Sequence, residues 1–537
     1  MTQPNRRQFL KLMSMILALS VLPLSCTNLI PEKPNILFVI IDDLNADISS
    51  EGGPIKTPNI DRLASSGIQF TRAYVQQPVC AASRASFLTG LRPNTAGVDY
   101  PYSYYFVDEL LPKVGIISDF FDTKGYNVKQ FGKVHHGLSN KYQQKTANPQ
   151  KGKYVSDELN QNAKKYGGNT QPPYEKSVEG EEGFIDHAVA TDVIRELQTM
   201  DKSKPFCILA GFVKPHLPFS APEEYWDLYD RDEITLPVPK ELAEGAPRLA
   251  VDQYYLWHFK WETNDPLIPF SDEYAKLIKH SYYASSSFVD HQVGRVLKSL
   301  EENNLNENTI VVLISDHGFL IGEQNYWGKN NLFEKGLRIP FIISWKGKVK
   351  AGMKTDALVE AVDVFPTMID LAGFTIPEYV EGTSIKPLLK DPEREWKSGV
   401  YSQHPRGWNE NIEGVSLRTD QYRYTEWFER PEGKILAREL YDYELDPTES
   451  RNLADEEAYA EIVAKLAIEL NEGWKAKLPK GIVNRSKNPV APPAYAWGNE
   501  GISRRVEWHR AFGGSEEDGW RESTRLREEQ ERSKTNK

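Results

Sequence analysis

The sequence predicts an α/β fold in which a large, mostly parallel β-sheet is sandwiched by helices. Two apolar runs of high β-propensity, at 34–41 and 309–314, have the composition of strands buried on both faces. Strand and helix patterns alternate from residue 34 to about 395, as in chains built from β-α-β units. Beyond this point successive strands and a helix at 456–474 predict a smaller C-terminal α+β subdomain built on an antiparallel sheet.

These patterns divide the chain into four segments. The last is dense in Arg and Glu and poor in apolar residues, so we expect a solvated helix or a disordered tail there. The segments are an export signal and linker at 1–33, the main α/β domain at 34–395, the C-terminal subdomain at 396–502 and the charged tail at 503–537.

The overall charge argues against a nucleic-acid partner. The 537 residues include 65 Lys and Arg and 76 Asp and Glu, which gives a formal net charge of −11. This charge repels polyanions at long range. An anionic ligand therefore requires a locally basic pocket.

The amino terminus has the pattern of a twin-arginine export signal. Arg6 and Arg7 precede an apolar stretch at 12–24. A membrane anchor is the alternative, but the stretch is short for a span, so we expect no stable membrane span. The protein is predicted to be exported, to the periplasm or the cell surface. Lipidation of Cys26 stays open, because the preceding residues match a lipoprotein cleavage box only in part.

Two carboxylates follow the first apolar run. Asp42 and Asp43 stand at the carboxyl end of the predicted strand, where ligands of open α/β sheets gather. A solvated turn is the alternative. Thr57 and Pro58 then have the pattern of a helix N-cap and first turn, and Gly67 has that of the helix end.

Cys80 is predicted at the N-terminal end of a short helix that stops at Gly90. Unpaired backbone N–H groups, with Arg84 one turn on, would give its sulfur an anion-binding environment. Cys26 lies in the export signal and Cys207 in a buried strand, so Cys80 has no evident disulfide partner. A buried cysteine that caps an ordinary helix is the alternative.

The stretch 125–137 has the pattern of a strand that runs into a loop, and this loop carries Lys133, His135 and His136. A lysine in such a loop is more often a solvated charge than a ligand. The polar stretch that follows, at 138–182, is predicted to be an insertion over the site, because loops of that length are usually functional or disordered.

Another buried-strand pattern, at 204–212, leads to His216, which has prolines on both sides. These prolines stiffen the backbone that presents the imidazole. A histidine has an ordinary pKa near operating pH and suits a general acid. A structural loop histidine is the alternative.

The late strand at 309–314 follows a helix at 282–300, and it ends in Asp316 and His317. Lys329 comes shortly afterwards. Two acidic strand ends side by side would repel each other unless a cation lay between them. Carboxylate-rich ligands favour Ca²⁺ first and Mg²⁺ next, and they disfavour Zn²⁺.

The motif of Cys80, Ala82 and Arg84, followed by Leu-Thr-Gly at 88–90, resembles the signature of the type I sulfatases of the alkaline phosphatase superfamily. The string Lys-Pro-His-Leu-Pro-Phe at 214–219 resembles the iduronate-2-sulfatase branch and its bacterial relatives. The likeness extends from residue 34 to about 455. It implies an alkaline phosphatase-like fold and makes the main domain a catalytic sulfatase domain.

The resemblance also implies the chemistry of the site. In this family a formylglycine-generating maturation enzyme converts the cysteine to formylglycine (3-oxoalanine), whose hydrate attacks sulfur beside one Ca²⁺ ion. Basic side chains neutralise the sulfate and a histidine protonates the leaving oxygen. The metal-binding residues so implied are Asp42, Asp43, Asp316, His317 and modified Cys80. The catalytic residues so implied are Cys80, Arg84, Lys133, His136, His216 and Lys329, with His135 as the alternative to His136.

The expected function is removal of O-sulfate from a sulfated carbohydrate, either a polysaccharide or its oligosaccharides. The branch suggests a 2-O-sulfate on a uronic acid of a glycosaminoglycan, or an algal polysaccharide such as ulvan. Two alternatives stay open. A phosphoester or phosphonate hydrolase of the same superfamily would more often carry Thr or Ser as nucleophile and a second metal. A non-catalytic carbohydrate-binding relative would release no sulfate.

Overall fold

The computed structural model describes residues 33–96, 115–136, 140–150, 153–166, 172–238, 240–251, 270–406, 412–429 and 433–487. The predicted export signal, Cys26 and the charged tail lie outside the described residues. Where the main domain ends and the C-terminal subdomain begins stays a prediction.

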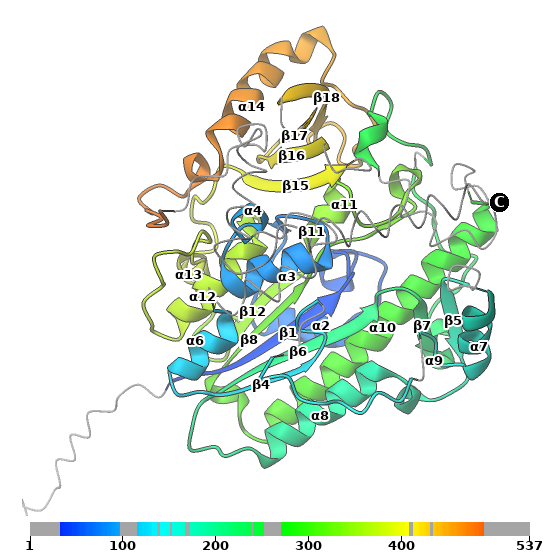
Figure 1. Ribbon diagram of the computed structural model, residues 1–537, viewed down its shortest axis with the longest axis vertical. Helices are drawn as coiled ribbons and strands as arrows, with labels where there is room; N and C mark the ends of the chain where they lie inside the picture. Colours follow the sequence, from blue (N-terminus) through cyan, green and yellow to red (C-terminus); the bar gives the residue numbers. More distant parts are fainter. Residues whose placement is uncertain are drawn as a thin grey trace, which may run out of the picture. The chain divides into compact units, whose positions relative to one another are not determined.

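A seven-stranded sheet has the order β13-β2-β12-β8-β1-β6-β4 (Figure 1). β1 pairs in parallel with β8 and with β6, and β4 pairs in parallel with β6. β12 runs antiparallel to β8 and β2. The mostly parallel sheet predicted from the sequence is confirmed. The strand bounds are β1 Asn35–Asp42, β2 Ile68–Phe70, β4 Asn127–Gly132, β6 Phe206–Pro215, β8 Thr309–Ser315, β12 Phe341–Trp345 and β13 Met353–Thr355.

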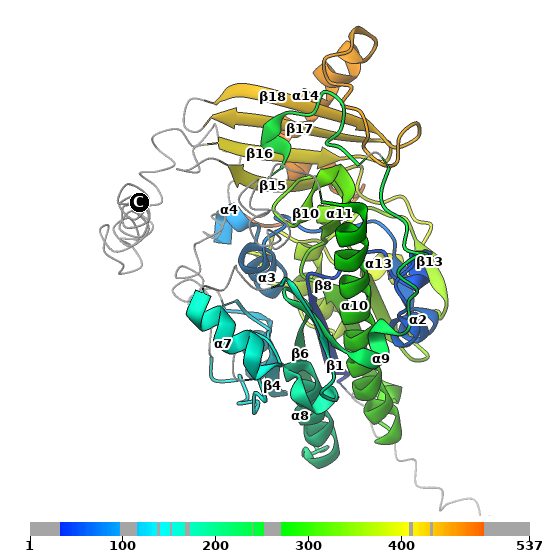
Figure 2. The same cartoon turned by 90° about the vertical axis from the view of Figure 1, so that its right-hand side faces the viewer.

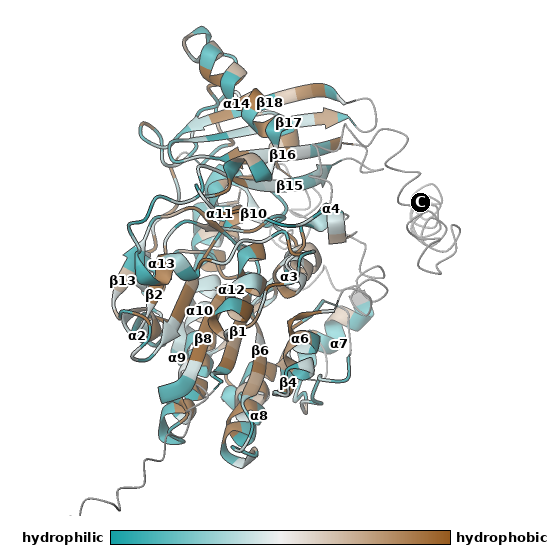
Figure 3. Ribbon diagram, turned by 90° about the vertical axis from the view of Figure 1, so that its left-hand side faces the viewer, coloured by the Kyte–Doolittle hydropathy of each residue, from teal (hydrophilic) through white to brown (hydrophobic). Residues whose placement is uncertain are grey.

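Helices cover both faces of this sheet because its central strands are apolar on both sides (Figure 3). In β1, Ile36 and Phe38 pack with helices α3, α6 and α12, whereas Leu37 and Val39 pack with α2, α8 and α10. Alternate side chains of a single strand thus enter two separate cores. The helix bounds are α2 Pro58–Ser65, α3 Cys80–Thr89, α6 Ile117–Thr123, α8 Ile185–Thr199, α10 Asp272–Glu302 and α12 Val364–Leu371.

Helix α2 begins after Thr57 with Pro58 in its first turn and ends just before Gly67, as predicted, but other parts of the chain hold both of its ends. The side chain of Thr57 does not cap the helix. Instead the carboxylate of Asp290, in α10, accepts hydrogen bonds from the N–H groups of Asn59 (3.2 Å) and Ile60 (2.8 Å). Gly67 is not left-handed; a Cβ at this position would collide with the backbone of Ile343. Asp290 and Ile343 are distant from α2 in sequence, so a local pattern could not predict these contacts.

A second, antiparallel sheet forms from the C-terminal part of the chain, as predicted (Figure 2). Its strands are β15 Val400–Arg406, β16 Ile412–Arg418, β17 Tyr422–Glu429 and β18 Lys434–Asp442. Helix α14, Ala460–Glu472, packs against it through Leu466 and Leu470. A buried ion pair, Arg423 to Glu334 at 2.5 Å, joins this sheet to the segment that follows β8.

The polar stretch at 138–182 contains regular structure, namely helix α7, Asp157–Tyr166, and strand β5, Tyr174–Ser177. β5 pairs in parallel with β7, Phe219–Pro222, which directly follows the loop of His216. The predicted position of this stretch over the site stays a prediction.

The remaining elements are short. Among the described residues, no helix combines the length and the apolar character needed to cross a membrane. The short elements are β3 Ala73–Tyr74, α4 Pro93–Ala96, α9 Glu223–Trp226, β9 Leu320–Ile321, β10 Trp327–Gly328, α11 Glu334–Leu337, β11 Arg338–Ile339, β14 Val359–Glu360 and α13 Lys386–Lys390.

Candidate active site

Several chain segments converge at the carboxyl edge of the central sheet. The neighbouring strands β1 and β8 end at Asp42 and Ser315, which brings Asp42, Asp43 and Asp316 together. Helix α3 lies beyond this edge and begins at Cys80 (Figure 2). The crevice outside the carboxyl ends of parallel strands is where α/β proteins place their ligands.

Asp43 has a φ of 64°, in the left-handed region that non-glycine residues seldom adopt. Its N–H donates to Oδ1 of Asp316 at 3.0 Å, and its carbonyl accepts a hydrogen bond from the hydroxyl of Tyr282 at 2.7 Å. The sequence did not single out Tyr282, because an aromatic residue in a helix carries no signal of such a contact. The backbone of Asp43 is thus held from β8 and from α10.

Cys80 is 2% exposed at the first turn of α3. Its Sγ lies 3.2 Å from Nε2 of His317, 2.9 Å from Nζ of Lys329 and 3.8 Å from Oδ1 of Asp43. The helix ends at Gly90 with a φ of 72°, as predicted. Burial, together with the charge of Asp42, raises the pKa of the Cys80 thiol well above its ordinary value. Cys80 stands at the helix start, as predicted, and burial has the largest effect on the pKa of its thiol.

Arg84 is 1% exposed and binds the carboxylates from within the fold. Its Nε donates to Asp316 at 2.9 Å and its Nη2 to Asp42 at 3.2 Å. Nη1 donates to the carbonyls of Lys133 and Val134. Every nitrogen of the guanidinium is therefore engaged, and Arg84 orients two carboxylates. Its predicted contact with a sulfate stays a prediction.

The pKa values of two carboxyl groups in the site, Asp42 and Asp316, are shifted in opposite directions. Burial raises the pKa of Asp42, but the charges of Lys133, His216 and Arg84 outweigh it and hold that pKa well below its ordinary value. Burial and the charge of Asp42 raise the pKa of Asp316. The two acidic strand ends do lie side by side, and basic side chains of the chain compensate their repulsion in part.

The donor set fits a hard divalent cation. Oδ2 of Asp43 is buried and has no hydrogen-bond partner among the described residues, and a metal ion would satisfy it. Carboxylate oxygens with few nitrogen donors suit Ca²⁺. The atoms of two overlapping sets lie within 4.8 Å of one another, and the sets are Asp42, Asp43, Cys80 and His216, and Asp42, Cys80, Asp316 and His317.

Lys133 follows β4 and forms an ion pair with Oδ2 of Asp42. The histidines after it differ in surroundings. His135 contacts Gln130 at 3.0 Å and Asn140 at 2.9 Å, which are groups of the β4 region. Burial and the charge of Lys133 lower the pKa of His136 to about 3, while Asp42 opposes them. His136 thus senses the site charges more strongly, which favours it over His135, although the choice stays a prediction.

His216 is half-buried and stands in the loop after β6. Its Nδ1 contacts the carbonyl of Leu217 at 2.9 Å. Because a carbonyl only accepts, Nδ1 carries the hydrogen and Nε2 is left for other partners. Burial lowers the pKa of His216 to about 4, although the charge of Asp43 opposes this shift.

Lys329 is 7% exposed and follows β10. Its Nζ donates to Oδ1 of Asp43 at 2.8 Å, in addition to its contact with Cys80. Its carbonyl accepts a hydrogen bond from the hydroxyl of Tyr326 at 2.8 Å. The structure thus brings together all the candidate residues that the sequence named, with His135 directed toward β4.

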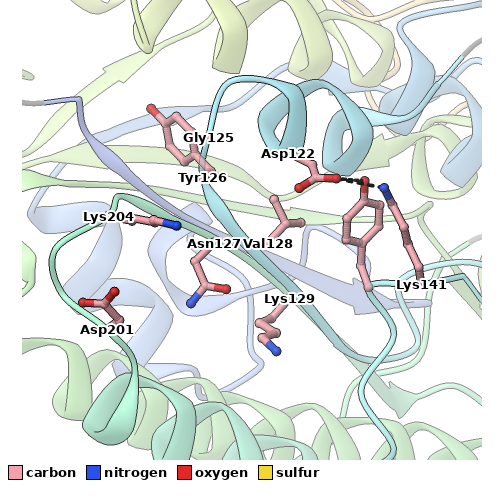
Figure 4. Close-up of a pocket in the computed structure, with 10 residues that line it drawn as sticks. Asp122, Gly125, Tyr126, Asn127, Val128, Lys129, Lys141, Asp201 and Lys204 are labelled. Atoms are coloured by element: carbon pink, nitrogen blue, oxygen red, sulfur yellow. Dashed lines mark hydrogen bonds and ion pairs between the residues drawn. The ribbon is translucent and has the colours of Figure 1, made fainter.

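A surface pocket of about 530 Å³ lies elsewhere, at the amino end of β4 (Figure 4). Asn127 and Lys129 of that strand line it, together with Tyr142, Asp201 and Lys204. Lys133 and the site follow the opposite end of the same strand. This pocket is therefore separate from the candidate active site.

Comparison with known proteins defines the class. A family model described as Sulfatase matches residues 34–374, and one described as N-sulphoglucosamine sulphohydrolase, C-terminal, matches residues 322–476. The chain belongs to the sulfatase family and is an enzyme of that family.

Individual relatives agree with this assignment. The chain is 30% identical to iduronate 2-sulfatase of Mus musculus over 517 residues, covering 80% of this chain and 93% of the relative. The structure of BT4656 in complex with D-glucosamine-2-N,6-O-disulfate matches with a TM-score of 0.66 at 22% identity, covering 82% and 97% of the two chains. Phosphonate monoester hydrolase of Agrobacterium radiobacter shares the fold, with a TM-score of 0.65 at 22% identity and coverage of 81% and 94%.

Proposed function

We propose that this sulfatase hydrolyses an O-sulfate ester of a carbohydrate, with Cys80 converted to formylglycine and one Ca²⁺ ion bound beside it. The observation that carries the proposal is the position of Cys80. Its Sγ stands at the start of a helix, within 3.2 Å of both His317 and Lys329 and 3.8 Å from Oδ1 of Asp43. The other carboxylate oxygen of Asp43, Oδ2, has no hydrogen-bond partner among the described residues.

In this proposal the charged side chains have separate tasks. Lys133 and Lys329 stand at the edge of the carboxylate cluster and would bind the sulfate oxygens. Arg84 holds Asp42 and Asp316 in place for the metal. His216, with His136 as the second candidate, would donate a proton to the leaving sugar oxygen. Burial lowers the pKa of both rings, and the negative charge of a bound sulfate ester would raise it again and favour the protonated imidazole.

The cofactors would supply what the side chains lack. Formylglycine provides an oxygen nucleophile, and Ca²⁺ bound by Asp42, Asp43, Asp316 and His317 provides positive charge where the sulfate binds. Overall, water and the sulfate ester yield the free alcohol, sulfate and a proton. Conversion of Cys80 requires a formylglycine-generating maturation enzyme as a partner.

The substrate class follows from sequence likeness. The mouse relative is named iduronate 2-sulfatase, so we propose a sulfated carbohydrate, and a uronic acid 2-O-sulfate within it. The twin-arginine pattern at residues 5–24 supports export to the periplasm or cell surface, with lipidation at Cys26 as a variant of that proposal.

The experiment is sulfate release from a panel of defined sulfated oligosaccharides by the wild type and by Cys80→Ala. Cys207→Ala is the matched control, because Cys207 is a second buried, free cysteine that lies within β6. We expect the Cys80 variant to lose release by at least about 1,000-fold and the control to keep it. Mass spectrometry of the active wild type should find the aldehyde. Equal release by wild type and Cys80→Ala would overturn the proposed mechanism.

A second candidate function is hydrolysis of a phosphate or phosphonate ester, because a phosphonate monoester hydrolase shares this fold. The same enzyme preparation should be assayed with matched sulfate, phosphate and phosphonate esters. Faster turnover of the phosphorus esters would replace the proposed function, whereas a protein that turns over none of them would be a carbohydrate-binding relative.

A further inference from the structure

The loop that carries His216 begins at an irregularity in the central sheet. Ile41 of β1 pairs with Phe212 of β6, but the next residue, Asp42, pairs with Pro215. Two residues of β6, Val213 and Lys214, are therefore extra. A bulge of this kind redirects the strand and leaves backbone groups without ladder partners.

The side chain of Asp186 receives those backbone groups. Its Oδ1 accepts a hydrogen bond from the N–H of Val213 at 2.7 Å, and its Oδ2 accepts one from the N–H of Lys214 at 2.8 Å. Asp186 is fully buried in the first turn of α8. One carboxylate thus holds both extra residues and fixes the bulge to a helix.

Lys214 closes the loop from within. It is 3% exposed, and its Nζ donates to the carbonyl of His216 at 3.0 Å and to that of Pro218 at 2.6 Å. Within the described part of the chain its ammonium forms no ion pair. Burial lowers the pKa of the Lys214 ammonium to about 8, although the charges of Asp186 and Glu175 oppose this shift. Burying this group costs free energy, so an apolar side chain would serve better if the position had only to be filled.

These contacts converge on the imidazole of His216. A ring nitrogen of His216 lies within 4.8 Å of ligand atoms of Asp42, Asp43 and Cys80. The side chain of Lys214 holds the backbone at His216 and just after it, and the side chain of Asp186 holds the end of the strand that leads to the ring. The ring itself is oriented by its hydrogen bond to Leu217.

We propose that Lys214 and Asp186 are positioning residues that hold the imidazole of His216 at the leaving oxygen of the substrate. The inference rests on the proposed function, in which His216 transfers a proton to that oxygen. Proton transfer by a misplaced acid fails most where the leaving group is a poor one, because a sugar alkoxide must be protonated and a nitrophenolate need not be.

The test compares leaving groups in the fully matured enzyme. Lys214→Met keeps the length and volume of the side chain but removes its donors. We expect kcat for a sulfated sugar to fall about 100-fold and kcat for 4-nitrophenyl sulfate to fall less than about 3-fold, with KM for each nearly unchanged. His216→Ala should give the same pattern and serves as the reference.

Lys279→Met is the matched control. Lys279 is also buried, and its Nζ donates to a carbonyl, that of Thr235 at 2.9 Å, but this partner lies outside the His216 loop. We expect its kcat to be unchanged on both substrates. If Lys214→Met does not fold, Asp186→Asn provides the same comparison, because it keeps the shape of the side chain and removes one of its two acceptor oxygens.

The outcomes separate the two proposals. Equal losses on both substrates, or no loss on either, would overturn the positioning role while sulfate release by the wild type upheld the enzyme. A wild type that hydrolyses neither ester would overturn the proposed function itself. A leaving-group effect in His216→Ala that is absent from Lys214→Met and Asp186→Asn would leave His216 as the acid and remove its proposed supports.

Discussion

Each carboxylate of the site faces a cation from elsewhere in the chain. Asp42 contacts Lys133 and Arg84, and Asp43 contacts Lys329 at 2.8 Å. Arg84 serves a second carboxylate, Asp316, from the same guanidinium. Because these groups are buried, loss of one cation leaves a carboxylate unpaired in a medium of low dielectric constant, which is far more costly than loss of a surface pair.

At the residue scale, the adjacent histidines provide a prediction. His136→Ala should lower kcat/KM about 100-fold, because the ring stands among the charges of Lys133 and Asp42. His135→Ala should leave kcat/KM nearly unchanged and reduce stability by about 1–3 kcal/mol, since it removes contacts with Gln130 and Asn140. Steady-state kinetics and thermal unfolding of both variants check this; the reverse pattern would assign the active-site role to His135.

Residue patterns pointed to the candidate site residues, but not to the contacts that surround them. Cys80, Asp42 and Asp43 carry local signals, namely a helix start and a strand end. No local signal marks the hydroxyl of Tyr282 on the carbonyl of Asp43, because that contact joins residues 239 positions apart. Nor does a local pattern show that the helix start at Cys80 is buried, because that burial depends on tertiary packing.

At the element scale, glycines show why strands and helices were predicted better than their joints. Gly90 ends α3 in the left-handed conformation, a local requirement that the sequence carries. Gly211, inside β6, must be a glycine because of a tertiary contact, since an added Cβ would collide with the carbonyl of Lys133. The N–H of Lys133 in turn donates to the carbonyl of Gly211 at 2.8 Å.

This close approach predicts different effects for two glycine substitutions. Gly211→Ala should displace the backbone of Lys133 and lower kcat/KM at least about 10-fold, with a loss of stability of about 1–3 kcal/mol. Gly67→Ala should cost similar stability, because its Cβ would meet the backbone of Ile343, but should leave kcat/KM unchanged. Kinetics on the folded fraction, with denaturant unfolding, tests the pair. Equal kinetic effects would show that Gly211 does not set the position of Lys133.

At the scale of the whole molecule, the candidate metal site ties together segments that are distant in sequence. Its donors come from the end of β1, the start of α3 and the end of β8, and so span residues 42 to 317. The alternation of strands and helices predicted that the carboxyl ends of the parallel strands meet. No local pattern predicted the ion pair between Arg423 of the C-terminal sheet and Glu334. An ion bound there stabilises the folded chain by mass action.

Chelation should therefore act on stability as well as on activity. Removing divalent ions is expected to lower Tm and abolish sulfate release, and Ca²⁺ at about 100 times its Kd should restore about 2.7 kcal/mol of stability. Differential scanning calorimetry of the wild type and of Asp43→Asn provides the readout, and the variant should respond little to Ca²⁺. A wild type whose Tm and turnover ignore both chelator and Ca²⁺ would contradict the metal assignment.

The 2% exposure of Cys80 has a consequence for the order of events during biosynthesis. Once helix α3 has packed, its first turn is closed to a modifying enzyme. If Cys80 becomes formylglycine, its oxidation must therefore come before this part of the polypeptide acquires its tertiary structure. Folding and conversion of Cys80 are then independent events, so a purified preparation can be fully folded while most of its molecules carry an unmodified cysteine and are inactive.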